Sequence, residues 1–244
     1  MKQKGQLDRF WIFAAGIFVV LVAANYFPLL FGKIPFPKDI VLQFPPWAGF
    51  PRSGDWQKTP DIGDIVTSFY PYRAFAADAI KHGTLPLWNP YMSSGAPFVG
   101  NTQSALFYPL NVLFYVLPLT AAWSISIALR MFLAAAFMAL FVRSIGGSKA
   151  GTILAGILFA SCGFMTAWQS QPMSDAAIWL PLVCYGIHRL YTTRSYASLA
   201  LVAAAFSMPV LAGHPETAAH LTLAGALMAL VIWVWPDRPK RRAF

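Results

Sequence analysis

Two stretches of the chain repeat one pattern, in which an acidic residue precedes apolar residues and an aromatic–proline pair. Asp39 begins the stretch 39–47, and Asp64 begins the stretch 64–72. A carboxylate can act as a general base, and two carboxylates can hold a divalent cation such as Mg²⁺ or Mn²⁺ through oxygen ligands. The alternative interpretation is a turn used twice, with an aromatic anchor at the membrane interface.

Three other residues combine a reactive or charged side chain with an informative position. Arg130 lies near the middle of an apolar run. An Arg there costs about 2.5–3.5 kcal/mol on insertion scales, so it must face the protein interior and a partner. That partner is either a lipid phosphate or a group on a neighbouring helix. His214 and Glu216 could join Asp39 and Asp64 as metal ligands, or His214-Pro215-Glu216 could simply begin a helix.

The elements that position these residues are apolar helices, because 57% of the 244 residues are hydrophobic and only 11% are charged. Soluble domains carry about 25% charged residues, so the composition indicates a membrane protein. The sequence predicts an all-α, polytopic transmembrane helix bundle of about six spans, forming a single membrane domain. The predicted spans are 10–31, 120–142, 150–168, 173–191, 196–212 and 217–235.

Residues 33–119 form a long loop with short interfacial helices in this interpretation. The segment 104–118 is apolar but short and contains Pro109, so we expect it to be interfacial or re-entrant. A short helix is predicted from Pro71 to His82, ended by Gly83.

Basic residues cluster beside the apolar runs and do not form one continuous basic face, which argues against nucleic-acid binding. The positive-inside rule then places both ends in the cytoplasm and the loop 33–119 outside. We therefore expect a multi-pass protein whose main partner is the lipid bilayer.

Several ordered motifs resemble one known family. They are Gly63–Tyr72, Leu85–Tyr91, Gly95–Phe98, Asn101–Asn111, Ser161–Phe164, Trp179–Leu182 and Gly213–Thr217. Their order resembles the YfhO-like bacterial membrane proteins. The resemblance implies a GT-C-type glycosyltransferase in the bacterial plasma (inner) membrane. Such a protein would take a sugar from a polyprenyl-phosphate-linked donor and transfer it to a cell-envelope acceptor on the outer face.

The resemblance places the family's acidic residue of the first outer loop on Asp64, with Asp39 as a second candidate for the catalytic group. The candidate substrate-binding residues are Arg130, Arg73, Trp88, Asn89, Tyr91, His214 and Glu216. Family members are usually longer, so we expect a fragment or a truncated member. Two alternatives are a lipid or sugar transporter or flippase, with broken helices and a polar site at mid-membrane, and a non-catalytic membrane scaffold.

Overall fold

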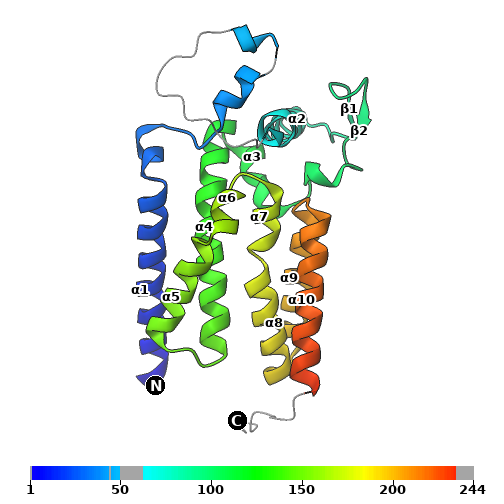
Figure 1. The fold of residues 1–244 in the computed structure, drawn as a ribbon. Coiled ribbons are helices and arrows are strands. Elements are labelled where there is room, and N and C mark those ends of the chain that lie inside the picture. Colours follow the sequence, from blue (N-terminus) through cyan, green and yellow to red (C-terminus); the bar gives the residue numbers. More distant parts are fainter. Residues whose placement is uncertain (1, 44, 50–62, 235–244) are drawn as a thin grey trace. The chain divides into compact units, whose positions relative to one another are not determined.

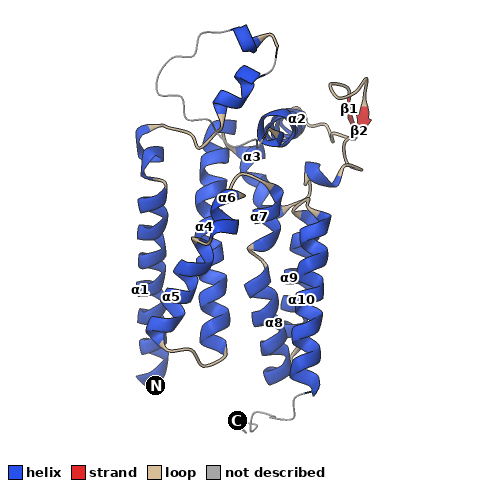
Figure 2. Ribbon diagram, viewed as in Figure 1, coloured by secondary structure: helices blue, strands red, loops and turns tan. Residues whose placement is uncertain are grey.

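The computed structural model describes residues 2–43, 45–49 and 63–234. This part of the chain is mostly helical, and its strands form a single two-stranded hairpin (Figure 2). The chain divides into two compact units. Unit 1 contains residues 1–27 and 127–244, and unit 2 contains residues 28–126. The structure thus confirms the helical class, and each unit is described by itself.

Unit 1 is built from helices that are mostly apolar. They are α1 (Lys2–Asn25), α4 (Leu119–Ser144, which begins in unit 2), α5 (Lys149–Ala160), α6 (Gly163–Ala167), α7 (Pro172–Ala177), α8 (Leu180–Thr193), α9 (Tyr196–Leu211) and α10 (Pro215–Val234). Among the described helices, α4 and α10 are long and apolar enough to cross a membrane by length and composition. Shorter apolar helices are 9–25 within α1, α5 and α9. Six crossings therefore stay a prediction.

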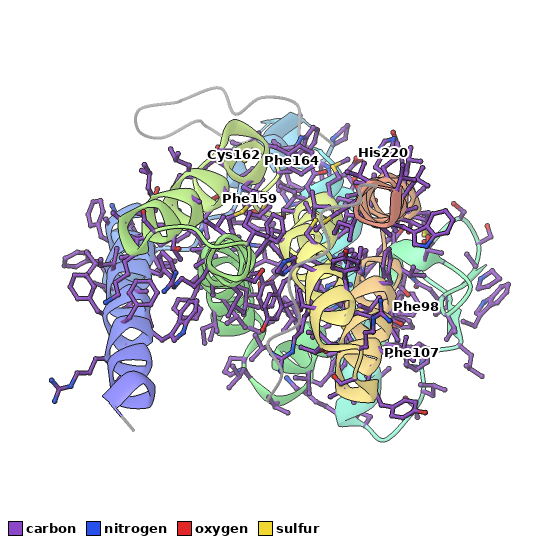
Figure 3. The ribbon with its side chains drawn as sticks, turned by 90° about the horizontal axis from the view of Figure 1, so that it is seen from below. Phe98, Phe107, Phe159, Cys162, Phe164 and His220 are labelled. Carbon is purple, nitrogen blue, oxygen red and sulfur yellow. The ribbon has the colours of Figure 1, made fainter. Side chains whose placement is uncertain are left out.

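Two of the predicted spans are interrupted in the structure. The range 150–168 holds α5 and α6, and the chain between them is extended at Cys162, with ψ of 157° (Figure 3). The range 173–191 holds α7 and α8, and Pro181 in the first turn of α8 cannot donate a backbone hydrogen bond. Helix α5 has 12 residues, which gives a length of about 18 Å, against a hydrocarbon core of about 30 Å.

Helix α5 packs through a stripe of small residues. Thr152, Gly156 and Ala160 recur every four residues and are buried. A Cβ atom added at Gly156 would lie 2.7 Å from Cζ of Phe18 in α1 and 2.8 Å from the carbonyl oxygen of Ala135 in α4. Small residues let helix backbones approach closely, as is typical of helix packing in membranes.

Helices α8, α9 and α10 lie side by side and form a second packed group (Figure 1). Val183 of α8 and Ala205 of α9 are buried between them. Gly225 of α10 leaves room for the ring of Phe206, because a Cβ atom there would lie 2.6 Å from its Cζ. The N-terminal end of α1 and the C-terminal end of α10 lie at the same end of unit 1 (Figure 1).

Unit 2 contains short elements. They are a π-helical turn (Ile65–Phe69), α2 (Tyr70–Lys81), β1 (Trp88–Asn89), β2 (Ala96–Pro97), α3 (Val112–Val116) and 3₁₀ turns at Lys38–Gln43, Trp47–Gly49, Thr102–Ser104 and Pro109–Asn111. A further 3₁₀ turn covers Phe27–Phe31. Helix α2 confirms the short helix predicted at Pro71–His82, and Gly83 follows it with φ of +73°.

The predicted interfacial segment 104–118 contains the turn Pro109–Asn111 and the five-residue helix α3. A helix of this length covers about 8 Å, which is too short to cross a bilayer, and the interfacial or re-entrant position of the segment stays a prediction. Helix α3 packs against α2. The core of unit 2 contains Tyr72, Ala76, Phe98 and Leu106.

Candidate functional site

Asp64 lies at the start of the helical segment that leads into α2. It is the N-cap of the π-helical turn Ile65–Phe69, but its side chain makes no capping hydrogen bond and is exposed. The turn is closed without it, because the backbone N–H groups of Val66 and Thr67 donate to the carbonyl oxygen of Gly63. An exposed carboxylate that makes no capping hydrogen bond can accept a proton.

A hollow of about 450 Å³ lies between α2 and the β1–β2 hairpin. It is lined by Thr67, Pro71, Tyr72, Ala74, Phe75, Asp78, Asn89, Tyr91 and Met92. Pockets for small ligands typically measure about 300–1,000 Å³ and combine apolar walls with a few polar groups. The size and lining of this hollow fit that description.

One face of the continuous helical segment forms the first wall of the hollow. Thr67, Pro71, Ala74 and Asp78 recur every three or four residues, so their side chains share a face. Asp78 is exposed, and its carboxylate lies 3.5 Å from Nδ1 of His82. Asp78 was not predicted as a site residue, although this helical spacing is visible in the sequence.

The β1–β2 hairpin forms the second wall. Asn89 is buried, and its Oδ1 accepts a hydrogen bond of 3.0 Å from the backbone N–H of Tyr91, which fixes the turn that carries Tyr91. Tyr91 is 86% exposed, and its ring contacts that of Phe75 edge to face, with 6.0 Å between ring centroids. The structure thus brings Asn89 and Tyr91 together in the hollow.

Trp88 does not line the hollow. A Cβ atom at Gly95 would lie 2.6 Å from Nε1 of Trp88, so the indole rests directly against this glycine. Gly95 also has φ of +109°, a conformation that L side chains rarely adopt. Trp88 and Gly95 together shape the hairpin that positions Asn89 and Tyr91.

Arg130 of α4 forms a buried ion pair with Asp175 of α7. The side chains are only 8% and 11% exposed, and Nη2 of Arg130 lies 2.7 Å from Oδ1 of Asp175. Nε donates to the same oxygen at 2.8 Å, and Nη1 donates to the carbonyl oxygen of Gln169. The prediction that Arg130 faces the interior and a partner is confirmed, and the partner is a group on a neighbouring helix.

This ion pair holds the turn between α6 and α7. Gln169 lies in that turn, and its Oε1 also accepts a hydrogen bond of 2.7 Å from the Tyr26 hydroxyl. Arg130 lies 13 residues before Arg143, so about 20 Å of helix separates the two residues. Asp175 lies in the first turn of α7 and was not predicted as the partner, although it is the acidic residue of an apolar stretch.

Arg73 is also buried and serves the packing of unit 2. Its guanidinium donates to the carbonyl oxygen of Ser104 and lies 5.9 Å from the ring centroid of Phe114. Nearby, the Tyr115 hydroxyl donates to the carbonyl oxygen of Leu106 at 2.7 Å. Burial raises the pKa of the Tyr115 phenol above its ordinary 10.0, and the positive charge of Arg73 opposes that shift.

His214 caps the N-terminus of α10. Its Nδ1 accepts a hydrogen bond of 3.2 Å from the Thr217 backbone N–H and lies 2.8 Å from the Thr217 hydroxyl oxygen. Glu216 is exposed in the first turn of the same helix, so the interpretation of His214-Pro215-Glu216 as a helix start fits this geometry.

The proposed metal set is not assembled within the described residues. No three His, Cys, Asp or Glu side chains lie close enough there to hold a metal ion. The side chain of Asp39 lies outside the described residues. Asp64 belongs to unit 2, whereas His214 and Glu216 belong to unit 1. A metal at these four residues stays a prediction.

Comparison with known proteins identifies the family. The family model for "Bacterial membrane protein YfhO" matches residues 63–207, more than half of the chain. The match begins directly before Asp64 and includes the hollow beside α2 and the Arg130–Asp175 pair. No curated protein and no solved structure matches the chain. The chain belongs to the YfhO family of bacterial membrane proteins.

Proposed function

We propose that the chain is a GT-C-type glycosyltransferase module of the bacterial plasma membrane, with both ends in the cytoplasm. It transfers a sugar from a polyprenyl-phosphate-linked donor to a cell-envelope acceptor on the outer face. One observation carries the proposal: the exposed carboxylate of Asp64 precedes, by one helical turn, Thr67 in the wall of the hollow beside α2. Both features lie in the part of the chain that matches the family.

The reaction requires a base for the acceptor hydroxyl. As the hydroxyl oxygen bonds to the anomeric carbon of the donor sugar, Asp64 takes its proton. The bond between that carbon and the phosphate oxygen breaks, and its electron pair leaves with the lipid phosphate. General base catalysis by a positioned side chain contributes about 10²- to 10⁴-fold in rate.

The hollow beside α2 supplies groups that recognise a sugar. The rings of Phe75 and Tyr91 offer apolar faces for the C–H face of a pyranose. The carboxylate of Asp78 accepts hydrogen bonds from sugar hydroxyls, and the amide of Asn89 can donate one. Asp78 is the one charged residue among those that line the hollow, so a neutral or amine-bearing sugar is favoured over an anionic one.

The test is sugar transfer from lipid-linked donors in membranes that contain the chain. We expect Asp64→Asn to lower the rate about 100-fold or more, because the amide keeps the shape but cannot take the proton. Asp78→Asn should raise KM more than it lowers kcat, since it weakens sugar binding. Asp8→Asn is the matched control, because it is the same change at a carboxylate outside the residues that match the family.

Two results would count against this assignment. Equal losses in Asp64→Asn and Asp8→Asn would remove the special role of Asp64. A wild-type chain that transfers no sugar from any lipid-linked donor would favour the non-catalytic scaffold.

A second candidate function, lipid transport, is favoured by the interrupted helices. Helices α5 and α6, and α7 and α8, are broken pairs, and Arg130 and Asp175 form a buried polar pair beside them. Transporters commonly place broken helices at a polar site in the membrane. In proteoliposomes, transport of a fluorescent lipid that is lost in Arg130→Gln but kept in Asp64→Asn would support this function over glycosyl transfer.

A further inference from the structure

A second hollow in unit 2, of about 650 Å³, lies where three segments of the chain meet. Gly32, Lys33, Ile34 and Phe36 follow the first apolar helix, Tyr70 begins α2, and Thr120 is the second residue of α4. No residue of this hollow lines the one beside α2, so the two hollows are separate.

Aromatic contacts fix the walls of this second hollow. Phe36, Tyr70 and Trp123 contact one another edge to face, with ring centroids 5.0, 5.9 and 5.4 Å apart. Nε1 of Trp123 donates a hydrogen bond of 3.2 Å to the carbonyl oxygen of Pro35. This bond ties the segment that carries Lys33 to the first turns of α4, so the hollow is a built feature and not a gap between loose loops.

The lining combines one cation with hydroxyl and apolar groups. Lys33 is the charged member, Tyr70 and Thr120 carry hydroxyls, and Ile34 and Phe36 are apolar. No acidic residue is among the lining residues. Lys33 has no carboxylate within ion-pair distance in the described part of the chain. Such a set favours an anion that is attached to an apolar group.

Apolar side chains beside the hollow indicate where that apolar group lies. Leu30 and Phe31 directly precede the lining residues and are 79% and 75% exposed. Residue 32 follows an apolar helix, and Thr120 lies in the first turn of a helix long enough to cross the membrane. Both therefore lie near an end of an apolar segment, where the phosphates of lipids are found.

From these observations we propose that the hollow around Lys33 binds the phosphate of an anionic lipid. Lys33 pairs with the phosphate, the hydroxyls of Tyr70 and Thr120 donate hydrogen bonds to its oxygens, and the acyl or isoprenoid chain lies against Leu30 and Phe31. The proposal of a phosphate site depends only on these lining residues. The additional proposal that the bound lipid is the glycosyl donor rests on the proposed function.

Binding to the full chain in nanodiscs of phosphatidylcholine tests the proposal. The probe is a fluorescent isoprenoid phosphate, and its dissociation constant is measured for wild type, Lys33→Gln, Lys33→Arg and Thr120→Val. We expect Lys33→Gln to weaken binding about tenfold and Thr120→Val to weaken it less, with Lys33→Arg near wild type. Lys149→Gln, which changes the lysine beside Phe10 in unit 1, is the matched control and should bind as wild type does.

Competition identifies the chemistry that is recognised. Unlabelled isoprenoid phosphate or phosphatidylglycerol should displace the probe, and which of them does so more strongly identifies the source of the phosphate. The proposal is overturned if Lys33→Gln binds as wild type does. It is also overturned if the uncharged isoprenoid alcohol competes equally well, or if inorganic phosphate alone binds as tightly as the lipid.

The same variants separate this inference from the proposed function. If Lys33→Gln loses lipid binding but transfers sugar normally, the phosphate site stands and its link to the donor fails. If Lys33→Gln binds lipid normally while Asp64→Asn abolishes transfer, the glycosyltransferase proposal stands and the phosphate site falls.

Discussion

Removal of the charge of Asp175 should destabilise unit 1 strongly. In Asp175→Asn the side chain keeps its shape, but the guanidinium of Arg130 loses the carboxylate that lies 2.7 and 2.8 Å from its nitrogens. The remaining neutral partner of Arg130 is the carbonyl oxygen of Gln169. Breaking a buried ion pair by changing one partner costs about 3–5 kcal/mol. We expect a value near the lower end, about 3 kcal/mol, because the amide oxygen still accepts a hydrogen bond.

The measurement is thermal unfolding of the purified chain in detergent, followed by tryptophan fluorescence. For a chain of this size about 1 kcal/mol corresponds to about 2–4 °C, so Tm should fall by about 6–12 °C. A double-mutant cycle with Arg130→Gln isolates the pair. Arg130→Gln with Asp175→Asn should lose less stability than the sum of the two single changes, by about 1 kcal/mol or more.

Two outcomes would refute this reasoning. A loss of less than about 1 kcal/mol in Asp175→Asn would mean that the pair is hydrated and not buried in a low-dielectric environment. Strictly additive effects in the cycle would mean that Arg130 and Asp175 do not interact energetically, whatever their distance.

Three further predictions concern packing, capping and ionisation. Gly156→Ala should lower Tm, because its Cβ would lie less than 3 Å from backbone and ring atoms. Gly16→Ala should not lower Tm, because a Cβ there has open space around it. Equal effects of the two changes would contradict close packing of α5. His214→Ala should cost about 1 kcal/mol of stability through loss of the α10 cap, and His214→Asn should restore it; an unchanged Tm in the alanine variant would argue against capping. Burial raises the pKa of the Tyr115 phenol in the folded state. The stability that Tyr115 contributes is therefore complete below pH 10 and is lost as pH rises above that value. Tyr115→Phe should flatten the fall in Tm at alkaline pH.

Periodicity and the cost of a charge in the membrane predicted part of this structure. The helix at Pro71–His82 follows from its amphipathic spacing and the glycine after it, and α2 covers Tyr70–Lys81. The inward position of Arg130 follows from the cost of an exposed charge in lipid. Both predictions depend on local or one-dimensional properties of the chain.

Features that depend on tertiary geometry were not predictable in the same way. Hydropathy averages over a window of about 19 residues, so breaks of two residues at Ser161–Cys162 and Ile178–Trp179 do not alter it enough to be seen. The hollow beside α2 depends on a hairpin whose strands have two residues each, and whose turn uses positive φ at Ser93, Ser94 and Gly95. Strands this short show no alternation of apolar and polar residues in the sequence, so the sequence did not predict that Tyr91 lies close to α2.

The short length of α5 has a consequence for how the chain enters the bilayer during synthesis. Its 12 residues satisfy their own backbone hydrogen bonds over only about half of the hydrocarbon thickness, so α5 is a poor substrate for insertion as a single segment. The preceding helix α4 has 26 residues and can partition into lipid first. Helix α5 would then leave the translocon while in contact with the surface of α4. A longer loop between the two helices at Gly146-Gly147 should weaken this contact and so reduce the yield of inserted protein.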